Sequence, residues 1–497
     1  MNKKLNRRDF LKIGSIATGA GILGACAPQI VTQTVAQTVE VPVTQQVQVE
    51  VTKEVMATQL VEVTKEVIKE VAPADPWLTG LVKPDVTGDF YMVSWEGEGE
   101  MRKWLLHIGK FFSKYYPKIK WNLDWGVSWG DYWSKIVTQL AGGAAIDMMW
   151  MHDSKVHSFA RRNLLVPMDD WLAKYPRPGW PDHFYPSQVQ SFVDNGKQMA
   201  FPYDWAPGIF YINNDLIEKA GFKVPDENTT WDQIMQMAQK ISKNTNDPKT
   251  AIWGLGNIPT TWTGGLYWIV KEFGGDFWTP DLKTATITDP KTIQALQLVA
   301  DQVWKYKVAP SSATIVGIGL DMETAFASGR IAMHYGLNDV SFRINEGIAG
   351  KFKWTVAPTP TGPAGRFQFS GGSAFCIPYT SRQKDMAYEL ITFVLANPDN
   401  LPTTAVMGGA LVSNMDYAEY GLPPKSLGID DAFRHAAIEM GKKNPCMPNY
   451  HAKYLDWETT VWPLFDPVWN GEKPDISTLA PQVQDGTQKI LDDLAKM

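Results

Sequence analysis

Residues 196–222, near the middle of the chain, constrain the fold more than any other stretch. Their sequence is GKQMAFPYDWAPGIFYINNDLIEKAGF. It contains two apolar runs typical of strands, residues 199–201 and 208–212, with Pro202 and Pro207 between them. Because proline has no N–H to donate to a sheet, we expect two strands joined by a stiff crossing. A crossing between two sheets can form the wall of a ligand cleft.

The chain is too long for a single ordinary core. Its 497 residues predict two or three packed units. With 44% hydrophobic and 20% charged residues, the composition is that of a globular protein. A pI near 5.7 and the absence of long basic runs argue against nucleic acid as a partner. Tryptophan is unusually frequent, with 21 copies, and several of them lie in polar, glycine-containing segments where core packing explains them less well.

The first 25 residues have the pattern of an export signal. Residues 6–12, NRRDFLK, carry twin arginines, and the apolar run at 13–23 is too short to span a bilayer comfortably. The segment 23–26, LGAC, resembles a bacterial lipobox. We expect residues 1–25 to be a twin-arginine lipoprotein signal peptide, and Cys26 to carry lipid that anchors the protein to the bacterial cell membrane, outside the cytoplasm. A plain signal peptide with an incidental cysteine is the alternative.

Residues 26–85 lack the hydrophobic pattern of a core. VEVTKEV occurs at 49–55 and again at 61–67, within a tract rich in Val, Thr, Gln, Glu and Lys. Isolated strands are not stable, so the pattern indicates a low-complexity tether that holds the folded part away from the membrane. A short helical or oligomerising stalk is the alternative.

Strands and helices alternate after the tether. Apolar runs predict strands at 90–95, 119–125 and 146–151, with helices at 101–116 and 131–140 between them. This order indicates a parallel sheet with helices on both faces.

Ligands bind such sheets at the carboxyl ends of the strands. Those ends carry Trp95 with Glu96, then residues 125–129, then His152 with Asp153.

The alternation continues in the second part of the chain. Thr230 and Gln233 form a capping-box pattern at the start of a helix, and Asp289-Pro290 has the pattern of an N-cap followed by proline at the first helical position. Further strands are expected at 331–336, 354–357, 367–370 and 374–377, and Ser381 is expected to cap a helix that ends at Ala396.

The order of several motifs resembles a known family. The motifs are Gly142-Gly143 with 146–150, then 165–170, 199–204, Tyr211-Ile212-Asn213, 219–221, Thr230-Trp231, 325–336, 358–365 and 371–377. As a set, spread over roughly residues 88–400, they are similar to bacterial extracellular solute-binding proteins of the family 1, sugar-binding kind.

The resemblance implies an α/β fold of the two-lobed periplasmic-binding-protein-like class (type II), with a hinge that the chain crosses three times. We expect the crossings near 202–206, 353–357 and 374–380. The N-terminal lobe would comprise 86–203 and 355–377, and the C-terminal lobe 204–354 and 378–497. The family delivers carbohydrate to the membrane permease of an ABC importer, so the resemblance implies that permease as a partner and a glycan as ligand. The many tryptophans favour an oligosaccharide over a monosaccharide.

A sugar offers a face of C–H groups and a rim of hydroxyls. Aromatic rings pack on the face, and carboxylates or amides bind the hydroxyls. Loops that combine both residue types are therefore candidates, and glycine lets backbone N–H groups approach a ligand closely. The ligand-binding candidates are Trp95, Glu96, Trp129, Asp153, Tyr203, Asp204, Trp205, Trp262, Tyr335, Gly371, Gly372 and Ser373. Each of them could instead brace the hinge, pack within a lobe or form a turn.

No catalytic residue, cofactor or metal is expected. His152 and His157 come closest to metal-ligand spacing, but five positions apart on a helix their side chains diverge. Neither G-x-S-x-G nor a P-loop occurs, which disfavours an enzyme acting on polysaccharide. A binding protein for a non-sugar solute and a surface scaffold are two further hypotheses. We expect a monomer, in which Cys376 and Cys446 could pair.

Overall fold

A computed structural model describes residues 78–95, 99–124, 127–260, 263–397, 400–401, 411–422, 435, 439 and 445–497. The chain divides into two compact units, Met1–Val71 and Ala72–Met497. The first unit lies outside the described residues, and with it the predicted signal peptide, Cys26 and most of the predicted tether. The described helices and strands all belong to the second unit.

The first sheet consists of five strands in the order β2-β1-β3-β12-β6. Their bounds are β1 (Gly88–Val93), β2 (Ile119–Asp124), β3 (Met148–His152), β6 (Phe201–Pro202) and β12 (Ser373–Cys376). As predicted, the first three strands are parallel, and β12 then runs antiparallel between β3 and β6. The helices that accompany this sheet are α3 (Gly99–Phe112), α4 (Trp129–Ala141), α5 (Asp153–Arg161), α6 (Asp169–Lys174), α7 (Pro186–Ser191) and α15 (Lys384–Ala396), and a small hairpin pairs β4 (Val193–Asp194) with β5 (Lys197–Gln198). We call this part the first half.

The second sheet is organised around the ten-residue strand β7 (Asp204–Asn213). Its order is β14-β11-β7-β9-β8, and β10 and β13 also pair with β7. The bounds are β8 (Trp253–Leu255), β9 (Ile331–Leu337), β10 (Trp354–Ala357), β11 (Gln368–Gly371), β13 (Leu411–Val412) and β14 (Pro445–Cys446). We call this sheet and its helices the second half.

The helices of the second half come from two separate parts of the chain. From the middle come α8 (Asn214–Lys219), α9 (Trp231–Ile241), α10 (Thr263–Glu272), α11 (Pro290–Trp304), α12 (Ser312–Gly317), α13 (Met322–Ala327), η1 (Asn338–Val340) and α14 (Ser341–Ile348). From the C-terminal part come α18 (Tyr454–Thr460), η4 (Trp462–Phe465), α19 (Asp466–Trp469), η5 (Ile476–Thr478) and α20 (Ala480–Leu494), and η2 (Met415–Gly421) follows β13.

Two of the three predicted helix N-caps are confirmed. Thr230 and Gln233 form a complete capping box before α9, and Asp289 caps α11 with Pro290 in its first turn. The prediction for Ser381 is wrong, because α15 begins at Lys384 and its N-cap is Gln383. The Ser381 hydroxyl instead donates to the Asp147 carboxylate at 2.9 Å, a tertiary contact that the local pattern could not indicate.

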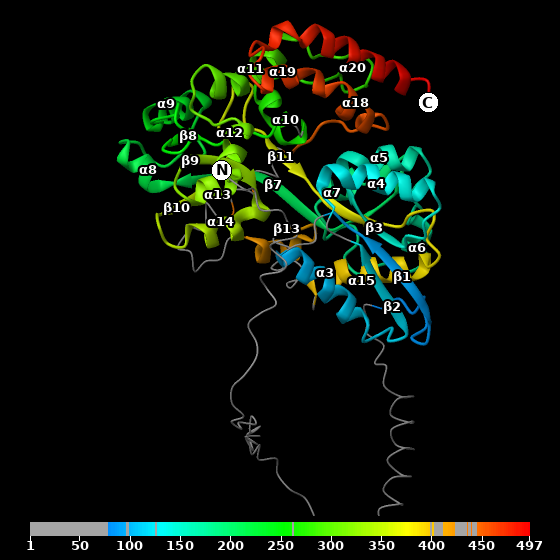
Figure 1. The fold of residues 1–497 in the computed structure, drawn as a ribbon. Coiled ribbons are helices and arrows are strands. Elements are labelled where there is room, and N and C mark those ends of the chain that lie inside the picture. Colours follow the sequence, from blue (N-terminus) through cyan, green and yellow to red (C-terminus); the bar gives the residue numbers. More distant parts are fainter. Residues whose placement is uncertain are drawn as a thin grey trace, which may run out of the picture. The chain divides into compact units, whose positions relative to one another are not determined.

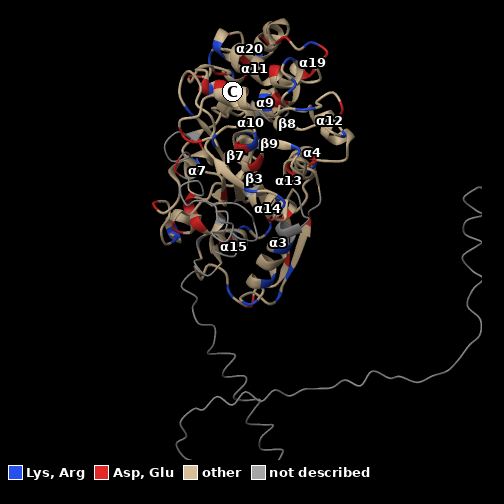
Figure 2. Cartoon of the chain, turned by 90° about the vertical axis from the view of Figure 1, so that its left-hand side faces the viewer, with Lys and Arg blue, Asp and Glu red and all other residues tan. Residues whose placement is uncertain are grey.

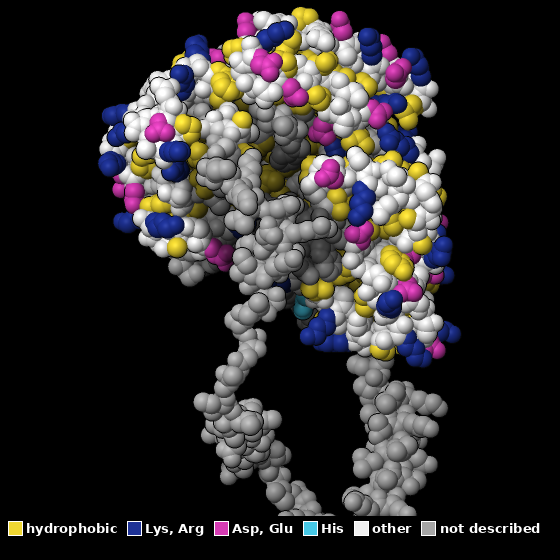
Figure 3. All heavy atoms as spheres, viewed as in Figure 1, with side chains coloured by type: hydrophobic (Ala, Val, Ile, Leu, Met, Phe, Trp, Pro, Cys, Tyr) yellow, Lys and Arg dark blue, Asp and Glu magenta, His cyan; other side chains and the backbone are white. Residues whose placement is uncertain are grey.

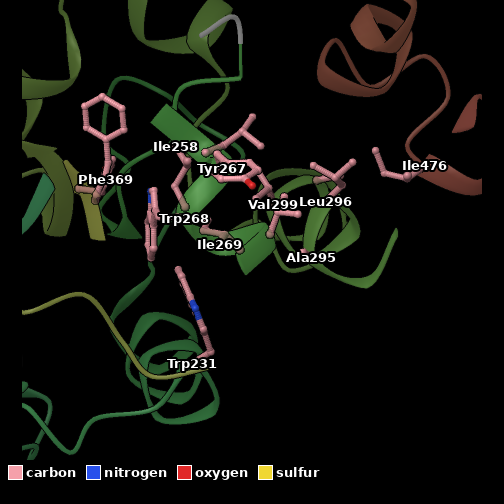
Figure 4. Packing of buried hydrophobic residues seen from close by; sticks show 14 of the residues in the cluster. Trp231, Ile258, Tyr267, Trp268, Ile269, Ala295, Leu296, Val299, Phe369 and Ile476 are labelled. Atoms are coloured by element: carbon pink, nitrogen blue, oxygen red, sulfur yellow. The ribbon is translucent and has the colours of Figure 1, made fainter. Parts of the chain in front are cut away.

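Each half has its own apolar core. The first includes Phe90, Trp104 and Phe375, and the second includes Trp231, Trp268 and Phe277. In the second core the rings of Trp231 and Trp268 stack with their centroids 5.7 Å apart (Figure 4). The high tryptophan content therefore contributes substantially to packing.

The chain passes between the two sheets at neighbouring points. It leaves the first sheet after β6 and enters the second at β7, with Tyr203 between them, and it returns through Gly372 between β11 and β12. The backbone N–H of Tyr203 donates to the carbonyl of Ser373 at 2.8 Å, so the two passages are joined. The neighbouring strands β7 and β11 lie side by side in Figure 1. The prediction of a crossing near 202–206 is consistent with the first passage.

Other predicted boundaries differ from the structure. Residues 354–357 form β10, which pairs with β7 inside the second sheet, so no passage occurs there. The residues of α15, assigned to the C-terminal lobe, pack in the core of the first half. A later passage lies between α15 and β13, which pairs with β7 of the second sheet. These differences arise because both the pairing of β10 and the packing of α15 depend on contacts between segments that are distant in the sequence.

Charge and hydropathy add two observations. Basic and acidic residues are interspersed along the described chain (Figure 2). Among the described helices, none combines the length and the apolar character needed to cross a membrane.

Candidate functional site

The two passages between the sheets bring Asp204 and Ser373 together. Asp204 begins β7 and Ser373 begins β12. Oδ1 of Asp204 accepts hydrogen bonds from the backbone N–H of Ser373 at 2.5 Å and from its hydroxyl at 2.7 Å. The Asp204 residue as a whole is partly buried.

Asp153 holds the adjacent residue in the same way. Its Oδ2 accepts from the backbone N–H of Gly372 at 2.9 Å, and its own N–H donates to the Gly372 carbonyl at 3.2 Å. Asp153 is fully buried at the start of α5, and its Oδ1 lies 3.0 Å from Nδ1 of His152. The carboxylates of Asp153 and Asp204 thus bind Gly372 and Ser373, two successive residues at the point where the chain returns to the first sheet.

Glycine is required at Gly371 and Gly372 because neighbouring atoms come very close. A Cβ on Gly372 would lie 2.3 Å from the Asp204 carbonyl oxygen and 2.3 Å from Oε1 of Gln188. A Cβ on Gly371 would lie 2.9 Å from Oδ2 of Asp153 and 2.2 Å from the Phe369 ring. These contacts are far below ordinary van der Waals distances, so the glycines allow the passages to approach each other.

The electrostatic environment changes the acidity of Asp204. Burial raises the pKa of its carboxyl to about 6, and the nearby Asp153 adds to this, while the Ser373 hydrogen bonds and His152 lower it. The carboxyl is therefore charged at neutral pH and takes up a proton in mildly acidic solution.

An aromatic side chain completes this group. Trp129, partly exposed at the start of α4, packs its ring edge-to-face with His152, with the centroids 4.9 Å apart. His152 pairs with Ser373 in the sheet register. We name Trp129, Asp153, Asp204, Gly372 and Ser373 the crossing site; they form a continuous chain of contacts through His152.

Four other predicted residues are used in packing. Trp95 stacks on Trp150, Tyr203 on Trp104 and Tyr335 on Trp268, and Trp205 packs against Tyr185 while its indole N–H donates to the Ser370 hydroxyl at 2.6 Å. The exposed fractions of Trp95, Tyr203, Trp205 and Tyr335 are 8%, 1%, 1% and 3%. Ligand contact by these four stays a prediction, and their burial supports a role in lobe packing. Glu96 and Trp262 lie outside the described residues.

Gln188 was missed by the sequence reasoning. Its side-chain N–H donates to the Ser370 carbonyl at 2.9 Å, and its buried Oε1 lies against Gly372 without a hydrogen-bond partner in the described part of the chain. Nothing in the sequence near Gln188 could have indicated this contact, because Ser370 is 182 residues away.

The molecular surface is hollowed between the described parts. Figure 3 shows a recess with hydrophobic side chains inside and acidic side chains at its rim. Among the described residues, no group of three His, Cys, Asp or Glu side chains could hold a metal ion. Cys376 in β12 and Cys446 in β14 are both buried and free, so they do not form a disulfide with each other.

Comparison with curated proteins finds related binding proteins. A probable ABC transporter-binding protein of Deinococcus radiodurans is 28% identical over 217 residues, which cover 42% of this chain and 50% of that protein. An arabinooligosaccharide-binding protein of Bacillus subtilis is 20% identical over 331 residues, which cover 65% of this chain and 73% of that protein. The chain spans about half to three fifths of the length of the first curated relatives that it matches.

Solved structures show the same fold. An ABC substrate-binding protein of Listeria monocytogenes in complex with cycloalternan superposes with a TM-score of 0.69 at 22% identity, covering 82% of this chain and 100% of that one. Maltose-bound MalE3 of T. maritima gives a TM-score of 0.67 at 22% identity, and the superposition covers 82% of this chain and 99% of that one. The predicted α/β periplasmic-binding-protein fold with two sheets is therefore confirmed.

A family model for bacterial extracellular solute-binding proteins matches residues 96–400, more than half of the chain. That match includes all five residues of the crossing site. The family is one of solute-binding proteins and not of enzymes, which agrees with the prediction that the chain is not an enzyme. The chain belongs to the bacterial extracellular solute-binding protein family.

Proposed function

We propose that this protein is the substrate-binding component of an ABC importer and that it binds a neutral carbohydrate, an oligosaccharide, at the crossing site. The observation that carries the proposal is the meeting of Asp153 and Asp204 on Gly372 and Ser373, beside the partly exposed ring of Trp129. Carboxylates that accept hydrogen bonds from hydroxyls, next to an aromatic face, match the chemistry of a sugar.

The charge of the site supports a neutral ligand. Its ionisable members, Asp153 and Asp204, are acidic and would repel a phosphate or a carboxylate. The nearest basic residue on α5, Lys155, is buried and paired with Glu458. The relatives from Listeria monocytogenes, Bacillus subtilis and T. maritima, whose names specify cycloalternan, arabinooligosaccharide and maltose, support the same ligand class.

The mechanism we propose is closure of the two halves around the ligand. The halves would act as lobes that rotate about the passages at Tyr203 and Gly372. A ligand that touches both lobes stabilises the closed state by its differential affinity for that state. The remaining predicted contacts, Trp95, Glu96, Tyr203, Trp205, Trp262, Tyr335 and Gly371, would join the site in the ligand-bound state. The closed complex, a monomer held to the membrane through lipid on Cys26, would then dock on the importer's permease.

Isothermal titration against a panel of oligosaccharides tests the ligand class. We expect at least one to bind with micromolar affinity, about −8 kcal/mol. The panel should include glycerophosphocholine, which is bound by the UgpB of Mycobacterium tuberculosis, another protein of this fold. Mass spectrometry of the ligand that co-purifies with the protein identifies the natural solute. Binding of the phosphodiester with no heat from any glycan would overturn the proposal.

The lipid anchor is tested separately. Replacement of Cys26 by Ser should move the protein from the membrane fraction to the soluble fraction of the cells that express it. Retention of the variant in the membrane fraction would argue against lipid attachment at Cys26, and it would leave the ligand assay untouched.

A further inference from the structure

One side of α3 and the turn after it is basic, although the chain as a whole is acidic. Residues 103–120 contain five lysines and no Asp or Glu, whereas the formal net charge of the whole chain is −6. Helical spacing of three or four residues places several of these lysines on the same side as an exposed leucine. We call this surface the basic face; its residues, all exposed, are Lys103, Leu106, Lys110, Lys114 and Lys118.

The charge of the basic face is not neutralised within the described part of the chain. There, Lys110, Lys114 and Lys118 form no ion pair with an acidic side chain, whereas Lys120 pairs with Asp89 at 3.6 Å. Burial lowers the pKa of the neighbouring His107, and the charges of Lys114 and Lys110 lower it further. The basic face can therefore attract an anionic partner.

The basic face also has an apolar component. Leu106 is 47% exposed, an unusual value for a large apolar side chain of this protein. The Lys114 amine lies 5.2 Å from the centre of the Phe111 ring, which packs on the Phe393 ring of α15 with the centroids 5.6 Å apart. Lysines that surround an exposed leucine over an aromatic layer suit a lipid surface, where the charges meet headgroups and the leucine enters the interface.

The segment that follows the predicted tether joins the folded part beside the end of α3. Leu78 and Val82 pack against the first core, and the hydroxyl of Tyr116, just after α3, donates to the Val82 carbonyl at 3.5 Å. A lipid on Cys26 would therefore keep the basic face close to a membrane. At such a high local concentration, a weak electrostatic attraction is sufficient for contact.

The basic face is separate from the crossing site. Figure 1 shows α3 and α15 on one face of the first sheet and α4 and α5, whose first residues are Trp129 and Asp153, on the other. The Glu389 carboxylate of α15 is buried and accepts from the Thr79 backbone N–H at 2.8 Å, so it does not add a negative charge to the surface.

We propose that the basic face binds the anionic phospholipid headgroups of the membrane to which the protein is tethered. The lysines would contact the phosphates, and Leu106 would enter the interface between them. This goes beyond the proposed function, because it requires neither the ligand nor the importer. It assigns a membrane-facing side to the first half.

Cosedimentation with vesicles tests the proposal on the full-length chain. The Cys26→Ser variant is used, so that no attached lipid contributes to binding. The probes are vesicles of phosphatidylcholine alone and of equal parts phosphatidylglycerol and phosphatidylcholine. We expect binding to the anionic vesicles to be at least about tenfold tighter, because each lysine near such a surface strengthens binding about fivefold. Salt at about 0.5 M should abolish the difference.

Two triple variants with the same change in total charge separate the basic face from a general charge effect. The first removes three charges of the basic face and should weaken binding to the anionic vesicles about a hundredfold; it combines Lys110→Gln, Lys114→Gln and Lys118→Gln. The control removes three exposed lysines elsewhere and should change binding less than about twofold; it combines Lys283→Gln, Lys305→Gln and Lys496→Gln. All six side chains are exposed, so both variants should fold, which circular dichroism verifies.

The outcomes distinguish this proposal from its alternatives. Equal binding to both kinds of vesicle, or equal losses in the two triple variants, would overturn it. If the first triple variant binds vesicles normally but no longer supports uptake by the importer, the basic face binds an acidic protein surface and the proposal is wrong. Oligosaccharide titration should give the same affinity for this variant as for the natural protein. A protein that binds anionic vesicles but no oligosaccharide would contradict the proposed function alone.

Discussion

The Asp204 carboxylate binds both the backbone N–H and the hydroxyl of Ser373, at 2.5 and 2.7 Å. Asp204 begins the strand that enters the second sheet, and Ser373 begins the strand that returns to the first. One oxygen, Oδ1, makes both bonds, so Oδ2 is left for another donor. The same carboxylate can therefore join the two passages and bind a hydroxyl of the ligand.

Replacement of Asp204 by Asn should weaken glycan binding about tenfold to a hundredfold, because a hydrogen bond to a charged group contributes about 1.5–3 kcal/mol. Ser373→Ala is the matched control: it removes one internal hydrogen bond but keeps the carboxylate, so its effect on affinity should be smaller. Isothermal titration with the co-purified ligand measures both. Equal affinities of Asp204→Asn and the natural protein would exclude Asp204 from the site.

The raised pKa of Asp204 predicts how stability depends on pH. The folded protein holds this proton up to about pH 6, whereas in the unfolded chain the group loses it near 3.8. Between these values the folded state binds more protons, so this group's contribution to stability is present below 3.8 and is lost as the pH rises to about 6. Urea unfolding of the natural protein and of Asp204→Asn over this range should give a steeper loss of stability for the natural protein. If the free energy of unfolding falls equally steeply with pH in both proteins, the prediction is contradicted.

Gly372 allows the passages to approach, so Gly372→Ala should be strongly destabilising. A Cβ there would lie 2.3 Å from the Asp204 carbonyl oxygen, and overpacking of this kind costs about 1–3 kcal/mol or more. Gly317→Ala is the control, because a Cβ at Gly317 meets no atom within 4 Å, and it should be neutral or stabilise by up to about 1 kcal/mol. Thermal and urea denaturation measure both. Equal effects of the two substitutions would mean that the passages can move apart without cost.

The sequence predicted local structure well where the signal was local. The parallel order of β1, β2 and β3 followed from alternating strands and helices, and the capping box at Thr230 marked the start of α9. It could not indicate that β10 pairs with β7 or that α15 packs in the first core, since both depend on contacts between distant segments.

The candidate site was predicted in part for the same reason. The carboxylates Asp153 and Asp204 and the glycines were chosen because of residue type next to a predicted strand end, and the structure brings them together. The same rule also selected Trp95 and Trp205, which are buried in packed clusters. An aromatic residue at a strand end serves a core as well as a ligand, and the sequence does not distinguish the two.

A buried ion pair joins the two halves on another face. Lys155 of α5 is 2% exposed, and its amine contacts the Glu458 carboxylate of α18 and lies 5.4 Å from the centre of the Tyr454 ring. Val156 of α5 belongs to the first core, whereas Tyr454 belongs to the second. A hydrogen bond from the Ser158 hydroxyl to the Ala452 carbonyl at 2.8 Å and an ion pair of Arg162 with Asp456 at 2.8 Å extend this contact.

Removing one partner of this pair should destabilise the protein strongly. Lys155→Met removes the ammonium group that contacts the buried Glu458 carboxylate, and breaking a buried pair in this way typically costs about 3–5 kcal/mol. The double substitution Lys155→Met with Glu458→Leu should recover most of that loss, because apolar side chains of similar size replace both charges. Arg162→Met is the control, since its more exposed pair with Asp456 should contribute at most about 1 kcal/mol. Urea unfolding measures all three; additive losses in the double variant would mean that the two charges do not interact.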